Sequence, residues 1–162
     1  MIYQILETVN KMTNFQSARA HCDVPCGIYD PISAQIAALT VVRMVDLMNG
    51  LDAEDVAYQN SMSRYVAVKE EHAEKAKHEI RVIWGDFFKE PQFEQYPELG
   101  KLTHTIMLFG SKSRQTADRE AAVEFVENIN KFAEIFWAIK GVKTKRATAP
   151  YAPALELVYP DL

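Results

Sequence analysis

Apolar residues recur at helical spacing through most of the chain. The clearest case is the segment 116–140, whose regularly spaced apolar residues are Ala122, Phe125, Val126, Ile129, Phe132, Ala133, Phe136 and Ile139. This spacing places them on one face of a helix, and Gly141 follows where a helix would end. We therefore expect an amphipathic helix over residues 116–140, with its aromatic side chains in the core.

Three other segments show comparable patterns. Asp30 and Pro31 provide an N-cap and a first-turn proline for a helix over residues 31–48, which Asn49-Gly50 ends. A helix over residues 52–88 is expected to present one inward face, formed by Tyr65, Val68, His72, Ala76, Ile80, Ile83 and Phe87. Its charged residues between positions 69 and 79 are expected to face solvent. A further helix after Pro97 carries Leu99, Leu102, Ile106 and Phe109. Four amphipathic helices predict an all-α fold, an antiparallel four-helix bundle.

The segments outside the helices suggest four parts. Residues 1–20 lack the apolar middle region of a secretory signal but end in Ala18-Arg19-Ala20, with small residues at the two positions that signal-type peptidases read. We expect a leader at 1–20 that is cleaved before His21, a separate segment at 21–30, the bundle at 31–141, and a proline-containing tail at 142–162. Three arrangements stay open for the tail: extended across the bundle, extended across a neighbouring subunit, or disordered.

Composition narrows the range of partners. The 162 residues are 48% hydrophobic and 25% charged, which fits one globular domain. The formal charge of −4 is mild, and no stretch interleaves basic and aromatic residues, so we expect no nucleic acid partner. No apolar run approaches the length that spans a bilayer, so we expect no membrane partner. Without an apolar signal region, a cytoplasmic location is expected.

His21, Cys22 and Cys26 bring both cysteines of the chain and one of its four histidines within six residues. A disulfide across so short a loop would restrict the unfolded chain little, so a chemical role is favoured over a structural one. Thiolates and imidazole suit zinc, copper or nickel. A structural zinc site is disfavoured, because it normally has four side-chain ligands and the chain has no second cysteine pair. If the chain is cut after Ala20, the α-amine of His21 and the deprotonated amide of Cys22 complete a square plane with both sulfurs. The His21 imidazole is then available axially, and this donor set suits Ni(II) or Cu(II).

The sequence His-Cys-Asp-x-Pro-Cys-Gly-x-Tyr-Asp-Pro, at positions 21–31, resembles the nickel-binding hook of the nickel superoxide dismutases. Further matching residues are Trp84-x-Asp86-x-Phe88-Lys89, Pro91, Phe93-Glu94, Tyr96-Pro97-Glu98-Leu99 and Ile135-Phe136-Trp137. The resemblance implies a superoxide dismutase that forms dioxygen and hydrogen peroxide. Its cofactor would be one nickel ion per subunit, cycling between Ni(II) and Ni(III). It also implies a homohexamer and a processing peptidase.

The resemblance also implies residue roles. His21, Cys22 and Cys26 would be the metal ligands, with His21 the axial one and a participant in catalysis. Tyr29 would stand near the open coordination position, and Lys89 would attract the anionic substrate at the approach. Two residues of the hook, Asp23 and Pro25, would support its shape.

The chain departs from the family at two positions. The glutamate and arginine that hold the axial imidazole in the family correspond to Ala37 and His72 here. We expect His72 to face inward, where it is either a core residue with its own partners or a hydrogen-bond partner of His21. The other two histidines, His78 and His104, are expected at the surface.

A different reading is a helical bundle that uses Cys22 and Cys26 as a reversible disulfide or as ligands of another metal, without dismutase activity. A purely structural protein would explain the helices but not the hook. The candidate cleavage site between Ala20 and His21 distinguishes the dismutase from the thiol switch. A thiol switch needs no cleavable bond so close to its first cysteine, Cys22.

Overall fold

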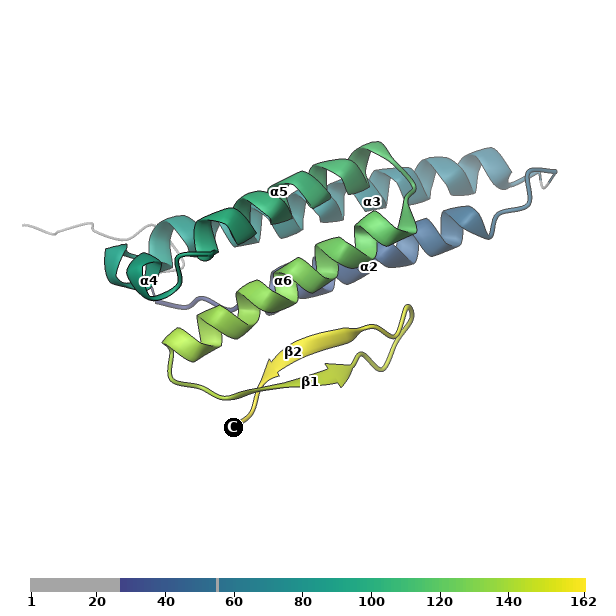
Figure 1. Ribbon diagram of the computed structural model, residues 1–162. Helices are drawn as coiled ribbons and strands as arrows, with labels where there is room; N and C mark the ends of the chain where they lie inside the picture. Colours follow the sequence, from purple (N-terminus) through teal and green to yellow (C-terminus); the bar gives the residue numbers. More distant parts are fainter. Residues whose placement is uncertain (1–26, 55) are drawn as a thin grey trace, which may run out of the picture.

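The computed structural model describes residues 27–54 and 56–162. Four long helices form its body: α2 (Ile32–Asn49), α3 (Tyr58–Val82), α5 (Leu99–Gln115) and α6 (Arg119–Ile139). Helix α2 contacts α3 and α6, and α5 contacts the same two helices. Helices that follow one another in the sequence run antiparallel (Figure 1). The predicted four-helix bundle is confirmed.

The connection between α3 and α5 is more elaborate than the sequence indicated. Helix α3 passes into a π-helical turn, η1 (Ile83–Phe87), and the backbone becomes extended at Phe88. A short helix, α4 (Glu90–Gln95), follows, and the Gln92 side chain caps its start by accepting from the backbone N–H of Lys89. The predicted helix over residues 52–88 is therefore shorter at both ends. Single π-helical turns of this kind occur within α-helices, and they are frequent at functional sites.

The inward face of α6 agrees with the prediction, since Phe125, Phe132 and Phe136 are fully buried. In the middle of α3 the buried residues are Lys69 and Ala73, whereas the predicted Val68 and His72 are only partly buried. The expectation that Lys69 faces solvent is wrong. Lysine is usually exposed, so the sequence pattern predicts it at the surface. Here the carbonyl oxygens at the end of α5 accept hydrogen bonds from the buried Lys69 ammonium.

Lys69 closes the end of α5. Its Nζ donates to the backbone carbonyl oxygens of Ser113, Arg114 and Thr116 at 2.6, 2.5 and 3.0 Å. Carbonyl groups in the last turn of a helix lack partners within the helix. The three contacts satisfy such groups and match the three donors of an ammonium. Burial lowers the pKa of Lys69 from its ordinary value.

By length and composition alone, α2 is apolar enough to cross a membrane. The expectation that no apolar run approaches that length is therefore wrong for this helix. Eight of its 18 residues are buried, and it contacts α3, α6 and the C-terminal strand. Seven of these eight are apolar and are covered by the rest of the bundle, whereas Ile36 stays 46% exposed.

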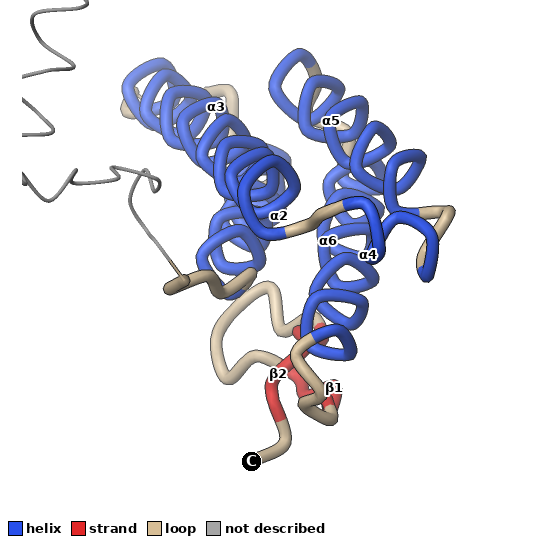
Figure 2. Tube along the Cα trace, turned by 90° about the vertical axis from the view of Figure 1, so that its left-hand side faces the viewer, coloured by secondary structure: helices blue, strands red, loops and turns tan. Residues whose placement is uncertain are grey.

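The C-terminal tail forms an antiparallel hairpin of β1 (Thr144–Thr148) and β2 (Glu156–Pro160), in which Thr144 pairs with Pro160. Gly141, with a φ of 71°, ends α6 in the left-handed conformation that favours glycine. Leu157 and Val158 are buried. The hairpin lies along the outside of α6, as the end-on view in Figure 2 shows. Of the three arrangements left open, the tail adopts the one that extends across the bundle.

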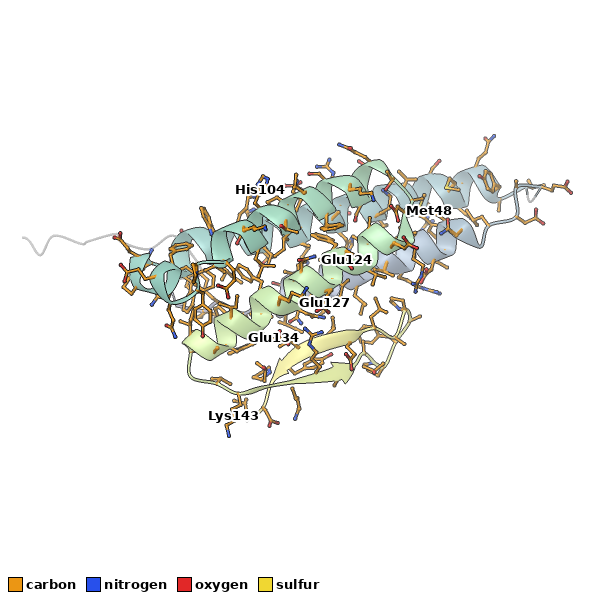
Figure 3. The ribbon with its side chains drawn as sticks, viewed as in Figure 1. Met48, His104, Glu124, Glu127, Glu134 and Lys143 are labelled. Atoms are coloured by element: carbon orange, nitrogen blue, oxygen red, sulfur yellow. The ribbon has the colours of Figure 1, made fainter. Side chains whose placement is uncertain are left out.

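Polar contacts attach the hairpin to two helices. Gln35 on α2 donates from Nε2 to Asn130 Oδ1 at 2.8 Å, and Asn130 Nδ2 donates to the backbone oxygen of Glu156 at 2.9 Å. Arg146 on β1 binds both carboxylate oxygens of Glu127 and one of Glu134, two residues on the side of α6 that faces the hairpin (Figure 3). The hydrogen bond from Arg146 holds the pKa of Glu127 below its ordinary value.

We predict that Asn130→Ala lowers the free energy of unfolding by about 2–3 kcal/mol, because it leaves a buried amide of Gln35 and a strand carbonyl without partners. Urea unfolding followed by circular dichroism measures the change. Lys145→Ala is the control, since it removes only an exposed ion pair with Asp161, and exposed pairs contribute about 0–1 kcal/mol. Equal effects of the two substitutions would contradict the role given to Asn130.

Candidate functional site

The predicted ligands His21, Cys22 and Cys26 lie outside the described residues, as do Asp23, Pro25 and the bond between Ala20 and His21. Within residues 27–54 and 56–162, no three histidine, cysteine, aspartate or glutamate side chains form a group that could hold a metal. The assignment of the ligands therefore stays a prediction from the sequence. What the structure describes is the part of the bundle next to the hook, beginning at Gly27.

Tyr29 attaches the end of the hook to the aromatic core. Its ring centroid lies 5.9 Å from that of Phe87 on η1, and Phe87 lies 4.7 Å from Phe136 on α6. Phe88 continues the cluster to Phe132 at 5.4 Å. Tilted and edge-to-face pairs of this kind contribute about 0.5–1.5 kcal/mol each beyond the area they bury. The residue three positions after Cys26 is thus held on the bundle by stacked rings.

The backbone on either side of Tyr29 is also fixed. Gly27 has a φ of 85°, a conformation that glycine adopts without strain, so the chain turns sharply there. Asp30 Oδ1 accepts a hydrogen bond from the backbone N–H of Ile32 at 2.8 Å, and Pro31 is buried at the first turn. Asp30-Pro31 therefore lies at the start of the helix, as predicted, but Pro31 takes the N-cap position expected for Asp30 and the helix begins at Ile32.

Two lysines lie near this aromatic cluster. Lys89 is exposed and follows Phe87 by two residues, and its backbone N–H donates to Gln92 Oε1 at 2.9 Å. Lys140 Nζ lies 5.3 Å from the ring centroid of Phe87 and 5.6 Å from that of Phe136, which is cation–π geometry. The start of α2, the end of α3, α4 and the end of α6 meet at one end of the bundle (Figure 1).

Sequence reasoning missed Lys140, although one signal was available. It follows Phe136 by four residues on the same helix, so its side chain lies on the same face. Together with Lys89 it brings positive charge to the end of the bundle from which the hook emerges.

The three described histidines, His72, His78 and His104, differ in burial. His72 is half-buried, and its Nδ1 lies 2.9 Å from the backbone oxygen of Val68 on its own helix. Whether it also contacts His21 stays a prediction. His78 and His104 are exposed, as expected, and His104 lies on the outer side of α5 in Figure 3. Ala37 is buried in the core, with 2% of its surface exposed.

A cavity of about 260 Å³ lies beside Tyr29, between the start of α2 and the end of α3. We call it the Glu79 cleft; its lining residues are Ile28, Tyr29, Asp30, Ile32, Ser33, Glu79, Val82 and Ile83. Ser33 Oγ donates to Glu79 Oε2 at 2.9 Å across it. Glu79 could not be singled out from the sequence, because it lies in the charged stretch that we assigned to solvent.

Comparison with known proteins identifies close relatives. The family model described as nickel-containing superoxide dismutase matches residues 16–140. A superoxide dismutase [Ni] of Streptomyces coelicolor is 39% identical over 121 residues, which are 75% of this chain and 88% of the relative. The corresponding protein of Streptomyces seoulensis is 38% identical over the same number of residues, with the same two shares.

Solved structures agree with these relatives. A native nickel superoxide dismutase structure superimposes with a TM-score of 0.66 at 38% identity, covering 74% of this chain and 99% of that one. A structure with nickel ligation corresponding to the oxidised state gives a TM-score of 0.67 at 36% identity, with coverages of 75% and 99%. The family match includes the hook sequence and ends at residue 140, before the hairpin.

Proposed function

The chain belongs to the nickel-containing superoxide dismutase family, and we propose that His21, Cys22 and Cys26 are the side chains through which it binds nickel. Its activity is the conversion of superoxide to dioxygen and hydrogen peroxide, with nickel as cofactor. The observation that carries the ligand assignment is that the family match includes the intact hook motif. Family membership favours the dismutase over the thiol redox module considered from the sequence.

The predicted donor set fits nickel chemically. Thiolates are soft ligands that bind nickel well, and Cys22 and Cys26 would hold the ion together with the amine and imidazole of His21 and the deprotonated amide of Cys22. When bound, nickel would supply one-electron chemistry by cycling between Ni(II) and Ni(III), and the anionic donors would stabilise the higher oxidation state. The overall reaction takes two superoxide ions and two protons to one dioxygen and one hydrogen peroxide.

The remaining proposed roles belong to Tyr29, Lys89 and Lys140. Tyr29, fixed by its contact with Phe87, holds a phenol close to the hook and so beside the path of the substrate. Lys89 and Lys140 attract superoxide to a protein whose formal charge is −4 and which would otherwise repel it.

The site as encoded is incomplete, because the α-amine of His21 forms a peptide bond with Ala20. The proposal therefore includes a peptidase that cuts this bond. It also includes self-association to a hexamer, since a hook of so few residues has no core of its own and needs neighbouring surface to hold it. A cytoplasmic location stays part of the proposal.

We predict that the active protein begins at His21 and carries one nickel ion per chain. Mass spectrometry of the native protein, after expression with nickel and the peptidase, measures both. A chain that retains Met1 should lack the amine ligand and the activity. A metal-free protein that retains Met1 and has a disulfide between Cys22 and Cys26 under these conditions would contradict the proposal.

We also predict that replacing both Lys89 and Lys140 by alanine lowers kcat/KM at low ionic strength by roughly 10-fold, because two cations that steer an anionic substrate are lost. Pulse radiolysis over a range of salt concentrations measures this, and the salt dependence should become weaker in the double variant. Lys145→Ala, on the hairpin, is the control and should change neither quantity. An unchanged rate in the double variant would refute the steering role.

A further inference from the structure

We propose that Gln35 and Asn130 are a positioning pair for Tyr29: the hydrogen bond between their side-chain amides fixes where α2 begins relative to α6, and so where the chain places Tyr29. Both residues are buried, and Gln35 Nε2 donates to Asn130 Oδ1 at 2.8 Å. The inference concerns the residue that attaches the hook to the bundle. It rests on the proposed function only for its effect on the reaction.

Apolar packing alone leaves the position of this part of α2 open. In the first two turns of α2 the buried residues are Ala34, Gln35, Ala37 and Ala38. Alanine side chains are short and interlock little with a neighbouring helix, and the hydrophobic effect has no preferred direction. A hydrogen bond, by contrast, is restricted in both length and angle. Gln35 is the buried residue of this stretch whose side chain can make one, so it sets the position of the helix.

Stability alone does not explain a glutamine at this place. Its Oε1 is buried and has no hydrogen-bond partner among the residues that the structure describes. A buried polar atom without a partner costs free energy, which an apolar side chain of similar size would avoid. Buried polar residues that lower stability specify one arrangement of helices in some proteins, as a single polar residue does in coiled coils. The Gln35 side chain is therefore better suited to fixing an arrangement than to stabilising the bundle.

The first turn of α2 connects Gln35 to Tyr29. The backbone N–H of Gln35 donates to the backbone oxygen of Pro31 at 3.0 Å. The backbone N–H of Ile32 donates to Asp30 Oδ1 at 2.8 Å. These two hydrogen bonds join the turn to the residues that directly follow Tyr29. A shift of Gln35 along or around the helix axis is therefore passed on to Tyr29.

Helix α6 carries both Asn130 and one side of the aromatic cluster that holds Tyr29. Phe136 follows Asn130 by six residues, about 9 Å along the helix axis. Its ring lies 4.7 Å from that of Phe87, which lies 5.9 Å from that of Tyr29. Aromatic pairs attract over centroid distances of about 4.5–7 Å, so they tolerate a shift that a hydrogen bond does not. The rings hold Tyr29 near the bundle, and the amide pair decides exactly where.

The C-terminal hairpin holds the Asn130 amide in the required orientation. Asn130 Nδ2 donates to the backbone oxygen of Glu156 on β2 at 2.9 Å. Because the nitrogen of the amide is engaged by the hairpin, the oxygen is directed to Gln35. The ion pairs of Arg146 with two glutamates of α6 fasten β1 on the same side of that helix (Figure 3). The hairpin lies beyond the part of the chain that matches the family model, and this gives it a role in placing Tyr29.

The first test uses the full chain without nickel and compares wild type with the double variant Gln35→Met/Asn130→Leu. Replacing both amides by apolar side chains of similar size leaves neither amide unpaired, so the midpoint of urea unfolding should stay close to that of wild type. The nuclear Overhauser contact between the rings of Tyr29 and Phe87 should be lost. The backbone amides in the first turn of α2 should exchange with solvent faster than in wild type.

Asn128→Leu is the matched control. Asn128 is also a buried asparagine of α6, but its Nδ2 donates to the backbone oxygen of Glu124 within the same helix. This substitution should leave the ring contact and the amide exchange as in wild type. Gln35→Met alone keeps the hydrogen bond between Asn130 and Glu156, and it supplies the same measurements if the double variant does not fold.

An unchanged contact between Tyr29 and Phe87 in the double variant would overturn the inference. If the unfolding midpoint fell while the contact persisted, the pair would only stabilise the bundle. Loss of the contact in Asn128→Leu as well would also overturn the inference, because any buried asparagine of α6 would then have the same effect.

The effect on the reaction is measured separately, on the processed, nickel-loaded protein. The double variant is expected to lose up to about 100-fold in kcat/KM, because small displacements of groups near a reaction are costly. An unchanged kcat/KM together with a lost ring contact would refute the role of the pair in the reaction. If wild type itself binds no nickel, the proposed function fails, whereas the nuclear magnetic resonance result still decides whether the amide pair places Tyr29.

Discussion

The contact between Tyr29 and Phe87 is the interaction on which the functional end of the molecule depends. A segment of a few residues that binds a metal has almost no apolar surface of its own, so its geometry has to come from what it is attached to. Tyr29 supplies that attachment, because its ring joins a cluster that continues through Phe87 to Phe136 in the core. The turn at Gly27 and the hydrogen bond from the Ile32 backbone N–H to Asp30 Oδ1 fix the backbone on either side of Tyr29.

The elements that build this end come from distant parts of the sequence. The π-helical turn η1 brings Phe87 toward Tyr29 and Phe88 into the core, and Lys140 at the end of α6 lies over the Phe87 ring. Lys69 stabilises the bundle away from the hook by closing the end of α5, and the hairpin is fastened across α6 through Asn130. Residues 142–162 lie beyond the part that matches the family model, so the family match does not account for this attachment of the hairpin.

Features with a strong local signal could be predicted from the sequence. The face of α6 follows from regular spacing of large apolar residues, and Asp30-Pro31 is a local start signal for α2. The burial of Lys69 could not be predicted, because it depends on carbonyl groups 44 to 47 residues away. The hairpin could not be predicted for the same reason, because Leu157 and Val158 are buried only against the assembled bundle. Glu79 resembles any solvated charge until the position of Ser33 on α2 is known.

The central claim is that this bundle carries a nickel ion bound by two thiolates and by nitrogen donors at a newly formed amino terminus. Nickel K-edge X-ray absorption spectroscopy of the chain that begins at His21 tests it most directly. The account predicts two sulfur ligands at Ni–S distance, with nitrogen completing the coordination of the reduced form. A spectrum that shows only nitrogen and oxygen ligands would contradict it, because neither Cys22 nor Cys26 would then be bound to the metal.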